Sequence, residues 1–236
     1  MDMESGKELT KLTCDDSDEF ESYIFNYDNN GKLIEVIETK EGAPYCYYSF
    51  IWNDDFVQAI AIYTNSSNNS YTFSLNIKDG LVKNALEERR SQNLGDTLVY
   101  NNSNKLIRNQ WNDGTTTFIW EGDKLVSYYI RHYSSIGQGF DVDAILSYNE
   151  TSCKKSCFHP ILLSENEHLL IDGYFKRIFA FAYPELVGLS TTLLPTKVDY
   201  GHYSLDYKYE FDKDGYVSKI IIPHTNWDVT YTLTWE

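Results

Sequence analysis

The sequence predicts a mainly β protein: a curved antiparallel sheet of sequential hairpin repeats, with one inserted α-helix covering the concave face. Three observations support this fold class. Residues 23–37 align without a gap on residues 207–221, sharing alternating aromatic residues, an Asp, a later Gly and an aliphatic run. Apolar and polar residues alternate strictly in several segments, and aromatic residues make up 16% of the 236 residues. Repeated hairpins with one buried face explain all three observations.

We expect a polar lead-in over residues 1–20, followed by a single hairpin-repeat domain over residues 21–236. Acidic residues dominate the lead-in, which is typical of a tail or an irregular segment. Turn signals then recur at intervals of about 24 residues, the length of two strands and two short connections. These turns are centred at Asn53–Asp55, Lys78–Gly80, Asn101–Asn104 and Glu121–Asp123.

The strand before each turn carries the clearest sheet pattern. From Tyr203 to Phe211, every odd position is apolar or aromatic and every even position is polar. Such alternation predicts an antiparallel sheet with one buried face and one face in water. Trp52, Trp120 and Trp235 each end such a segment, so we expect a Trp at the same place in several units. The pattern predicts about a dozen strands.

The repeats are interrupted by a helical insert at about residues 151–200. Within residues 167–183, apolar residues follow helical spacing, and Pro184 bounds the stretch. We therefore expect an amphipathic helix there, followed by a loop through Leu193–Pro195. A sheet with one apolar face needs a cover, and this helix is the candidate. Deletion of residues 160–195 is expected to give aggregated protein.

The charge and the hydropathy pattern exclude several classes of function. The formal net charge of -15 repels phosphate backbones, so we expect no nucleic-acid partner. No apolar stretch approaches the roughly 18 residues that cross a bilayer, so we expect no membrane-spanning segment. The first residues have neither the basic region nor the apolar core of a secretory signal. Either the protein is cytosolic or a leader has been removed from it.

The hairpin pattern, the segment Gly188–Val198 and the Tyr-x-Tyr-x-Phe-Asp-x-Asp-Gly unit that ends at Gly215 together resemble a group of Bacteroidetes lipoproteins of unknown function. Members of that group are exported, lose a leader at a lipidated cysteine and carry tandem Tyr-rich hairpins. The resemblance implies an extracytoplasmic location, in the periplasm or on the outer-membrane surface, and a possible lipid anchor upstream of this chain. Residues 209–217 are also similar, as a single unit, to the tyrosine–aspartate repeats of large bacterial wrapped-sheet proteins.

The sequence contains two candidate metal sites. The segments that begin at Asp28 and Asp212 look like the start of a calcium loop, but Ile37 and Ile221 occupy the position of the required Glu. Both segments are therefore interpreted as hairpin turns. Cys153 and Cys157, followed by His159, leave three alternatives open, namely plain thiols, a disulfide or a metal site; Cys14 and Cys46 could also pair. We expect no bound metal and no cofactor.

The pattern does not favour catalysis. The histidines are scattered, and no Ser or Cys lies in a nucleophile-elbow context. Asp141 and Asp143 would lie on the same face of a strand, which we interpret as two exposed acids rather than a catalytic pair. We predict that the protein is not an enzyme and has no catalytic residue.

Exposed aromatic residues are the remaining candidates for a functional site. Tyr and Trp rings stack on sugars and anchor protein interfaces, and adjacent Tyr residues on a strand face opposite sides. On this basis we predict a ligand-binding role for Tyr45, Tyr47, Tyr129 and His132. The preferred function is a non-enzymatic exported protein that binds a ligand, a protein partner or a glycan. The alternatives are a glycan-handling enzyme or glycan-binding accessory protein, and a scaffold without a small-molecule site.

Overall fold

A computed structural model describes residues 7–15, 21–65, 70–89, 92–133, 140–163, 174–224 and 227–236. The described residues form one antiparallel sheet with strands β1 Leu9–Cys14, β2 Ser22–Tyr27, β3 Leu33–Lys40, β4 Ala43–Trp52, β5 Phe56–Tyr63, β6 Ser70–Lys78, β7 Leu81–Arg89, β8 Gln92–Tyr100, β9 Leu106–Trp111, β10 Gly114–Glu121, β11 Lys124–His132, β12 Phe140–Phe158, β13 Ser190–Asp199, β14 Ser204–Asp206, β15 Lys208–Phe211, β16 Val217–Pro223 and β17 Asp228–Trp235. A 3-10 helix, η1, spans Pro160–Leu163, and two α-helices, α2 and α3, span Tyr174–Ala182 and Pro184–Val187.

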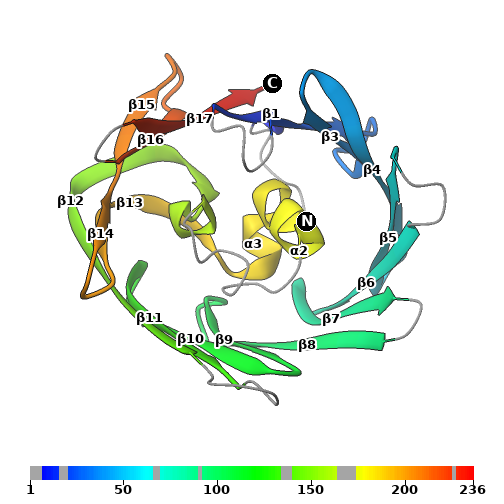
Figure 1. Cartoon of the computed structure of the whole chain (residues 1–236), viewed down its shortest axis with the longest axis horizontal. Coiled ribbons are helices and arrows are strands. Elements are labelled where there is room, and N and C mark those ends of the chain that lie inside the picture. Colours follow the sequence, from blue (N-terminus) through cyan, green and yellow to red (C-terminus); the bar gives the residue numbers. More distant parts are fainter. Residues whose placement is uncertain are drawn as a thin grey trace.

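The sheet closes on itself. Strands pair with their neighbours in chain order, and β1 lies between β2 and β17 because it pairs with both. Strands β14 and β15 are separated only by Tyr207, and they pair with β13 and β16 respectively. Figure 1 shows the resulting ring of strands around the helices. The prediction of a curved antiparallel sheet of sequential hairpins is confirmed, but the estimate of a dozen strands is too low, since the sheet has 17.

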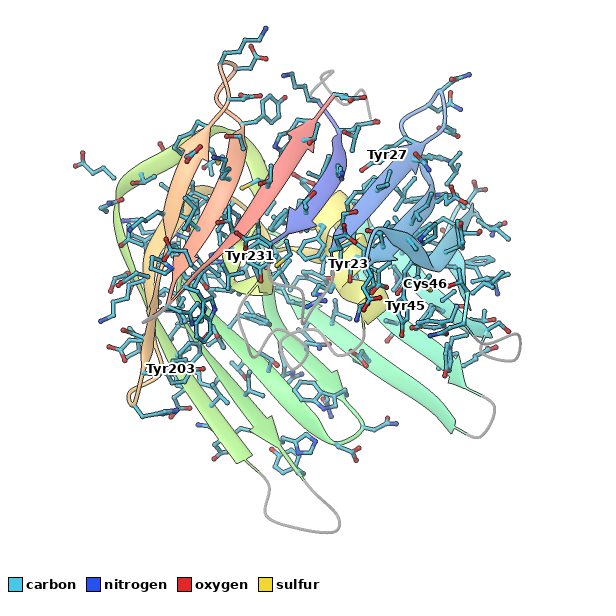
Figure 2. The ribbon with its side chains drawn as sticks, turned by 45° about the horizontal axis from the view of Figure 1, so that its top comes forward. Tyr23, Tyr27, Tyr45, Cys46, Tyr203 and Tyr231 are labelled. Atoms are coloured by element: carbon cyan, nitrogen blue, oxygen red, sulfur yellow. The ribbon has the colours of Figure 1, made fainter. Side chains whose placement is uncertain are left out.

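Because consecutive strands are antiparallel, their connections alternate between two rims of the ring. The rim that we call the insert rim carries the β2–β3, β4–β5, β6–β7, β8–β9, β10–β11 and β15–β16 turns, and the helical segment between β12 and β13. The other connections, such as β3–β4 and β13–β14, lie on the opposite rim. Tyr27, near the end of a strand at the insert rim, and Tyr203, at the opposite rim, lie at opposite ends of the ring in Figure 2.

Alternation along each strand determines which side chains face inward. On β4, Cys46, Tyr48 and Phe50 are buried, whereas the residues between them are partly or fully exposed. Inward apolar side chains from all round the ring form one continuous core. The predicted register, with one dry and one wet face, is therefore the register of the structure.

The helices lie inside the ring rather than over one face of an open sheet (Figure 1). All four residues of η1 are buried, and so are the five consecutive residues 177–181 of α2. A helix buried on every side is typical of the centre of a core. The predicted helix is confirmed over residues 174–182, and its expected first residues, 167–173, lie outside the described ranges. Within those ranges, no helix has the length and apolar character needed to span a bilayer.

A ring of hydrogen bonds, which we call the aromatic girdle, runs around the insert rim. In five of the seven bonds, the last aromatic residue of a strand donates its hydroxyl or indole N–H to a backbone carbonyl near the start of the preceding strand. Of the other two donors, Tyr148 lies in the middle of β12, and Tyr209 of β15 donates to Pro195 in the middle of β13. All seven donor–acceptor distances are 2.5–3.0 Å. The pairs are Tyr27 to Leu9, Trp52 to Leu33, Tyr100 to Val82, Trp120 to Leu106, Tyr148 to Leu125, Tyr209 to Pro195 and Trp235 to Val217. The prediction that a Trp recurs at one place is thereby confirmed.

Three turns of the insert rim share one hydrogen-bond pattern. The Asp28 carboxylate accepts the backbone N–H groups of Asn30 and Lys32 at 2.8 and 2.9 Å. Asp212 accepts the corresponding N–H groups at 2.9 Å, and the Asn101 side-chain oxygen does the same at 2.9 and 3.0 Å. The left-handed position is filled by Gly31, Gly215 and Asn104 in turn. The Asp residues thus stabilise turns, as predicted.

Two segments differ from the prediction. Residues 9–14, placed within an irregular lead-in, form β1, whose apolar residues Leu9, Leu12 and Cys14 are buried. The predicted loop through Leu193–Pro195 is wrong, because these residues belong to β13. Proline is tolerated there because the β12–β13 register shifts at Pro195, where no regular ladder bond is required of it.

Candidate functional site

The four predicted ligand-binding residues lie on two distant strands. Tyr45 and Tyr47 belong to β4, whereas Tyr129 and His132 belong to β11, with β5 to β10 between them in the ring. The structure therefore does not bring them together in one site. Tyr45 lies beside Cys46 on β4, as Figure 2 shows.

Tyr47 and Tyr129 face outward. Tyr47 is paired with Ile37 and Ile62, so its ring belongs to an outer row of apolar side chains. The guanidinium of Arg131 lies over the Tyr129 ring, 5.7 Å from the ring centroid.

Arg131 also forms ion pairs with Asp141 and Asp143, the two acids that were expected on the same face of a strand. Its guanidinium lies 2.6 Å from Asp143 and 3.5 Å from Asp141, and both carboxylates are exposed. Two carboxylates that share one cation in water form a surface ion-pair network.

A cluster of aromatic rings around Tyr45 is the best-defined candidate site. Tyr45 contacts Tyr63 edge to face at a centroid distance of 5.5 Å, and Tyr63 contacts Tyr71 in the same way at 5.9 Å. The Lys40 ammonium lies 5.0 Å from the Tyr45 centroid. All four residues are partly exposed and lie at strand ends on the opposite rim. We call Lys40, Tyr45, Tyr63 and Tyr71 the Tyr45 cluster.

A buried carboxylate lies at the base of the Tyr45 cluster. Glu38 is 5% exposed and accepts a hydrogen bond from the Tyr48 hydroxyl at 3.0 Å. It faces inward by the alternation of β3, just before the β3–β4 register shift. Burial raises the pKa of Glu38, and the Tyr48 hydrogen bond and the charges of Lys40 and Arg177 partly offset this. Arg177 is contributed by α2, so the insert takes part in the electrostatics of this region.

Burial affects the ionisable groups of this region. Burial raises the pKa of the Cys46 thiol to about 12, so the thiol is protonated and a poor nucleophile at neutral pH. Burial also raises the pKa of Tyr63 and Tyr48. What the site offers is aromatic faces, one ammonium group and one carboxylate.

Other aromatic and histidine residues also lie at the opposite rim. Tyr200 and Tyr203 stack at 4.6 Å, and His224 and Trp227 stack at 5.5 Å. His132 ends β11 on this rim. Sequence reasoning did not single out Tyr63, Tyr71 or Trp227. These residues share a position at or beside strand ends on one rim. That shared position can be recognised only once the strand directions are known.

The cysteines near the end of β12 form a second cluster. The sulfur atoms of Cys153 and Cys157 are 3.9 Å apart, and both residues are buried. The hydrogen bond from Cys157 lowers the pKa of Cys153, and the same pairing, with burial, raises the pKa of Cys157. Within the described ranges, no three His, Cys, Asp or Glu side chains are grouped as metal ligands.

The closed all-β ring with helices in its interior is also found in solved structures. A porin-like protein from Bacteroides uniformis matches with a TM-score of 0.66 and 12% identity, over 97% of this chain and 98% of that one. A porin-like protein from Bacteroides vulgatus matches with a TM-score of 0.69 and 12% identity, over 98% and 99%. No protein-family model and no curated protein matches the sequence. At this identity the likeness establishes a shared fold.

Proposed function

We propose that this chain is a non-enzymatic envelope protein, exported in bacteria of the Bacteroides type, that binds a glycan or a protein partner through its opposite rim. The observation that carries the proposal is the Tyr45 cluster, which presents three tyrosine rings and a lysine above the buried Glu38. The two Bacteroides structures with this fold, both described as porin-like, support an envelope location.

The interior argues against a conducting channel, even though the similar structures are described as porin-like. Large side chains from the sheet and the helices meet inside the ring. Phe158 and Phe181, for example, contact each other at a centroid distance of 4.7 Å and are both buried. Channels of this general shape keep a polar, water-filled lumen. A ring filled by an apolar core acts instead through its surface.

A glycan is the ligand class that best fits the Tyr45 cluster. Aromatic faces pack against the C–H faces of sugar rings, and the polar groups beside them can form hydrogen bonds with hydroxyl groups. Glycoside hydrolysis requires a pair of carboxyl groups about 5–10 Å apart. Among the described residues, Asp141 and Asp143 are held by Arg131 on the outer face, and Glu38 is bound by Tyr48. The glycan-handling enzyme is therefore the weaker alternative.

The test is a glycan array probed with the purified protein and with two single variants. Tyr45→Ala is expected to abolish binding, because it removes the ring that contacts both Tyr63 and Lys40. Tyr129→Ala, on the outer face of β11, serves as the matched control and is expected to bind normally. Loss of binding in Tyr129→Ala with retention in Tyr45→Ala would move the site to the outer face. An array without hits would favour the protein-binding or scaffold alternative.

The location is tested separately in cells that express the complete natural gene. We propose that its product is exported and anchored by a lipid attached upstream of this chain. Metabolic labelling with a fatty-acid analogue, combined with protease treatment of intact cells, is expected to give a labelled and protease-accessible protein. A cytosolic and unlabelled product would reject the envelope assignment.

A further inference from the structure

The irregular end of β12 brings together two thiols that a regular strand would separate. Residues four apart on an extended strand lie about 13 Å apart, at about 3.3 Å per residue. The β12–β13 register shifts between Tyr148 and Ser152 and again between Ser152 and Cys157. These shifts fold the chain back locally, so that the sulfur atoms of Cys153 and Cys157 are 3.9 Å apart.

The surroundings of the pair bury both thiols and hold Cys153 in place. Cys153 and Cys157 are 5% and 3% exposed. The Cys153 sulfur also lies 3.6 Å from the Thr192 carbonyl oxygen, which fixes it against β13. A disulfide bond is about 2.05 Å long, so a shift of about 2 Å would bring the two sulfur atoms to bonding distance. Cys14 and Cys46, which are also buried, lie on other strands, β1 and β4.

We propose that Cys153 and Cys157 form a structural disulfide when the chain folds in an oxidising compartment. The exported location proposed above supplies such a compartment, where protein disulfides act as oxidants. The Cys153 thiolate attacks a disulfide R–S–S–R, forming a mixed disulfide and releasing one thiolate. The Cys157 sulfur loses its proton and attacks the Cys153 sulfur, forming the intramolecular bond and releasing the second thiolate. The two cysteines lose two electrons and two protons, and the oxidant becomes two thiols.

The bond forms during folding, because burial shields both sulfur atoms once the ring has closed. It links the two ends of the register-shifted segment, just before β12 ends and the chain enters η1. The oxidised pair therefore fixes the base from which the helical insert starts.

The experiment refolds the reduced, urea-unfolded protein in a mixture of oxidised and reduced glutathione. The product is then unfolded in urea in the presence of an alkylating agent, which labels every free thiol. The labels are counted by intact mass and located by peptide mapping. Of its 4 cysteines, the wild type is expected to label only Cys14 and Cys46. The matched variant C14S/C46S is expected to take up no label and to be lighter than its reduced form by two hydrogen atoms.

Labelling of all four cysteines, or a bond that involves Cys14 or Cys46, would overturn the proposal. Circular dichroism of each refolded sample checks that it has reached the native fold, so a sample that fails to fold is not scored. C153S/C157S is expected to give the same label count with and without the oxidant. The experiment uses only the purified chain, so its outcome is independent of the binding proposal.

Discussion

His159 is an uncharged histidine that links the helical insert to the aromatic girdle. Its Nδ1 accepts the backbone N–H of Ile161 at 3.3 Å, so Nε2 carries the proton and contacts the Tyr148 hydroxyl at 3.3 Å. Tyr148 in turn donates to the Leu125 carbonyl at 2.8 Å. The residue is fully buried, and burial, together with the positive charge of Lys105, lowers its pKa to about 3.

This low pKa predicts that the protein loses stability in mild acid. Below pH 6.5 the unfolded state binds a proton at His159 that the folded state binds only near pH 3. The free energy of unfolding therefore decreases as the pH is lowered from 6.5 towards 3, by at most about 1.4 kcal/mol per pH unit for this residue. His159→Asn retains an acceptor but does not titrate.

We expect His159→Asn to be less stable than the wild type at pH 7 by about 1–3 kcal/mol, because it fills the site less well. Between pH 7 and pH 5 the stability of the variant relative to the wild type should shift by about 2 kcal/mol in favour of the variant. Urea denaturation at both pH values measures this. A difference that stays constant between pH 7 and pH 5 would show that His159 titrates normally in the folded protein.

At the scale of elements, the aromatic girdle adds side-chain hydrogen bonds between strands along the insert rim. Most of its bonds join the end of one strand to the start of the strand before it, and each gives a backbone carbonyl a side-chain donor. Lysine ammonium groups cover several of its rings at 4.7–5.9 Å: Lys32 over Trp52, Lys83 over Tyr100, Lys105 over Trp120 and Lys124 over Tyr148. In the β5–β6 unit, where Ile77 takes the aromatic position, its backbone N–H bonds to the Asp55 carbonyl instead.

The substitution Trp120→Phe tests the girdle. It removes the indole N–H that donates to the Leu106 carbonyl and weakens the contact with Lys105. We expect a loss of about 1–2 kcal/mol in the free energy of unfolding, measured by urea denaturation. Trp227→Phe, at an exposed Trp outside the girdle, is the matched control and should change the stability by less than about 0.5 kcal/mol. Equal effects of the two substitutions would contradict a girdle role.

A second prediction concerns the contact between the insert and the insert rim. Gly188 has a φ of 71°, and its carbonyl accepts the Leu106 N–H at 3.1 Å. A Cβ at this position would lie 2.7 Å from the Asn104 carbonyl oxygen and from the Leu106 nitrogen. Gly42 has nearly the same φ, 73°, but a Cβ there would have no atom within 4 Å.

We therefore expect Gly42→Ala to cost about 1 kcal/mol, which reflects the left-handed backbone alone. Gly188→Ala should cost at least about 2 kcal/mol more, because backbone atoms must move apart. Thermal and urea unfolding of the two variants provide the comparison. If both lose the same stability, the insert does not pack tightly against the β8–β9 turn.

Much of the element order could be predicted from the sequence, because it depends on local signals. The alternation of Tyr203–Phe211 and the turns at Asn53–Asp55 and Lys78–Gly80 reflect backbone geometry within a few residues. Strand β1 was missed because it is short and one of its two partners, β17, comes from the far end of the chain. The Tyr45 cluster could be predicted only in part, since Tyr63 and Tyr71 meet Tyr45 through strand pairing rather than through spacing.

At the scale of the whole molecule, the closed sheet and the helical insert depend on each other. Closure removes free sheet edges, but it leaves an apolar interior that α2, α3 and η1 fill. Tyr183 shows how the insert is held: its hydroxyl accepts the Leu33 N–H at 2.7 Å and donates to the Gly31 carbonyl at 3.1 Å. Its ring also contacts Trp52 of the aromatic girdle at 5.2 Å.

This dependence predicts the result of removing the insert cleanly. Phe158 is paired with Ser190, so an Asn-Gly turn can replace residues 159–189 and close β12 and β13 as a hairpin. We expect the shortened chain to aggregate or to form an expanded state that binds an apolar dye, because the interior loses its filling. Size-exclusion chromatography and dye fluorescence measure both outcomes. A compact monomer with cooperative unfolding would show that the ring is stable without the insert.

The two ends of the described chain lie side by side, since Glu8 and Glu236 exchange backbone hydrogen bonds at 2.7 and 3.0 Å. A fusion partner or a chip linker joined to Glu236 therefore starts from the insert rim. The Tyr45 cluster lies on the opposite rim. Immobilisation through the C-terminus should thus leave the recognition surface open to the medium, which makes C-terminal capture the natural geometry for ligand screening.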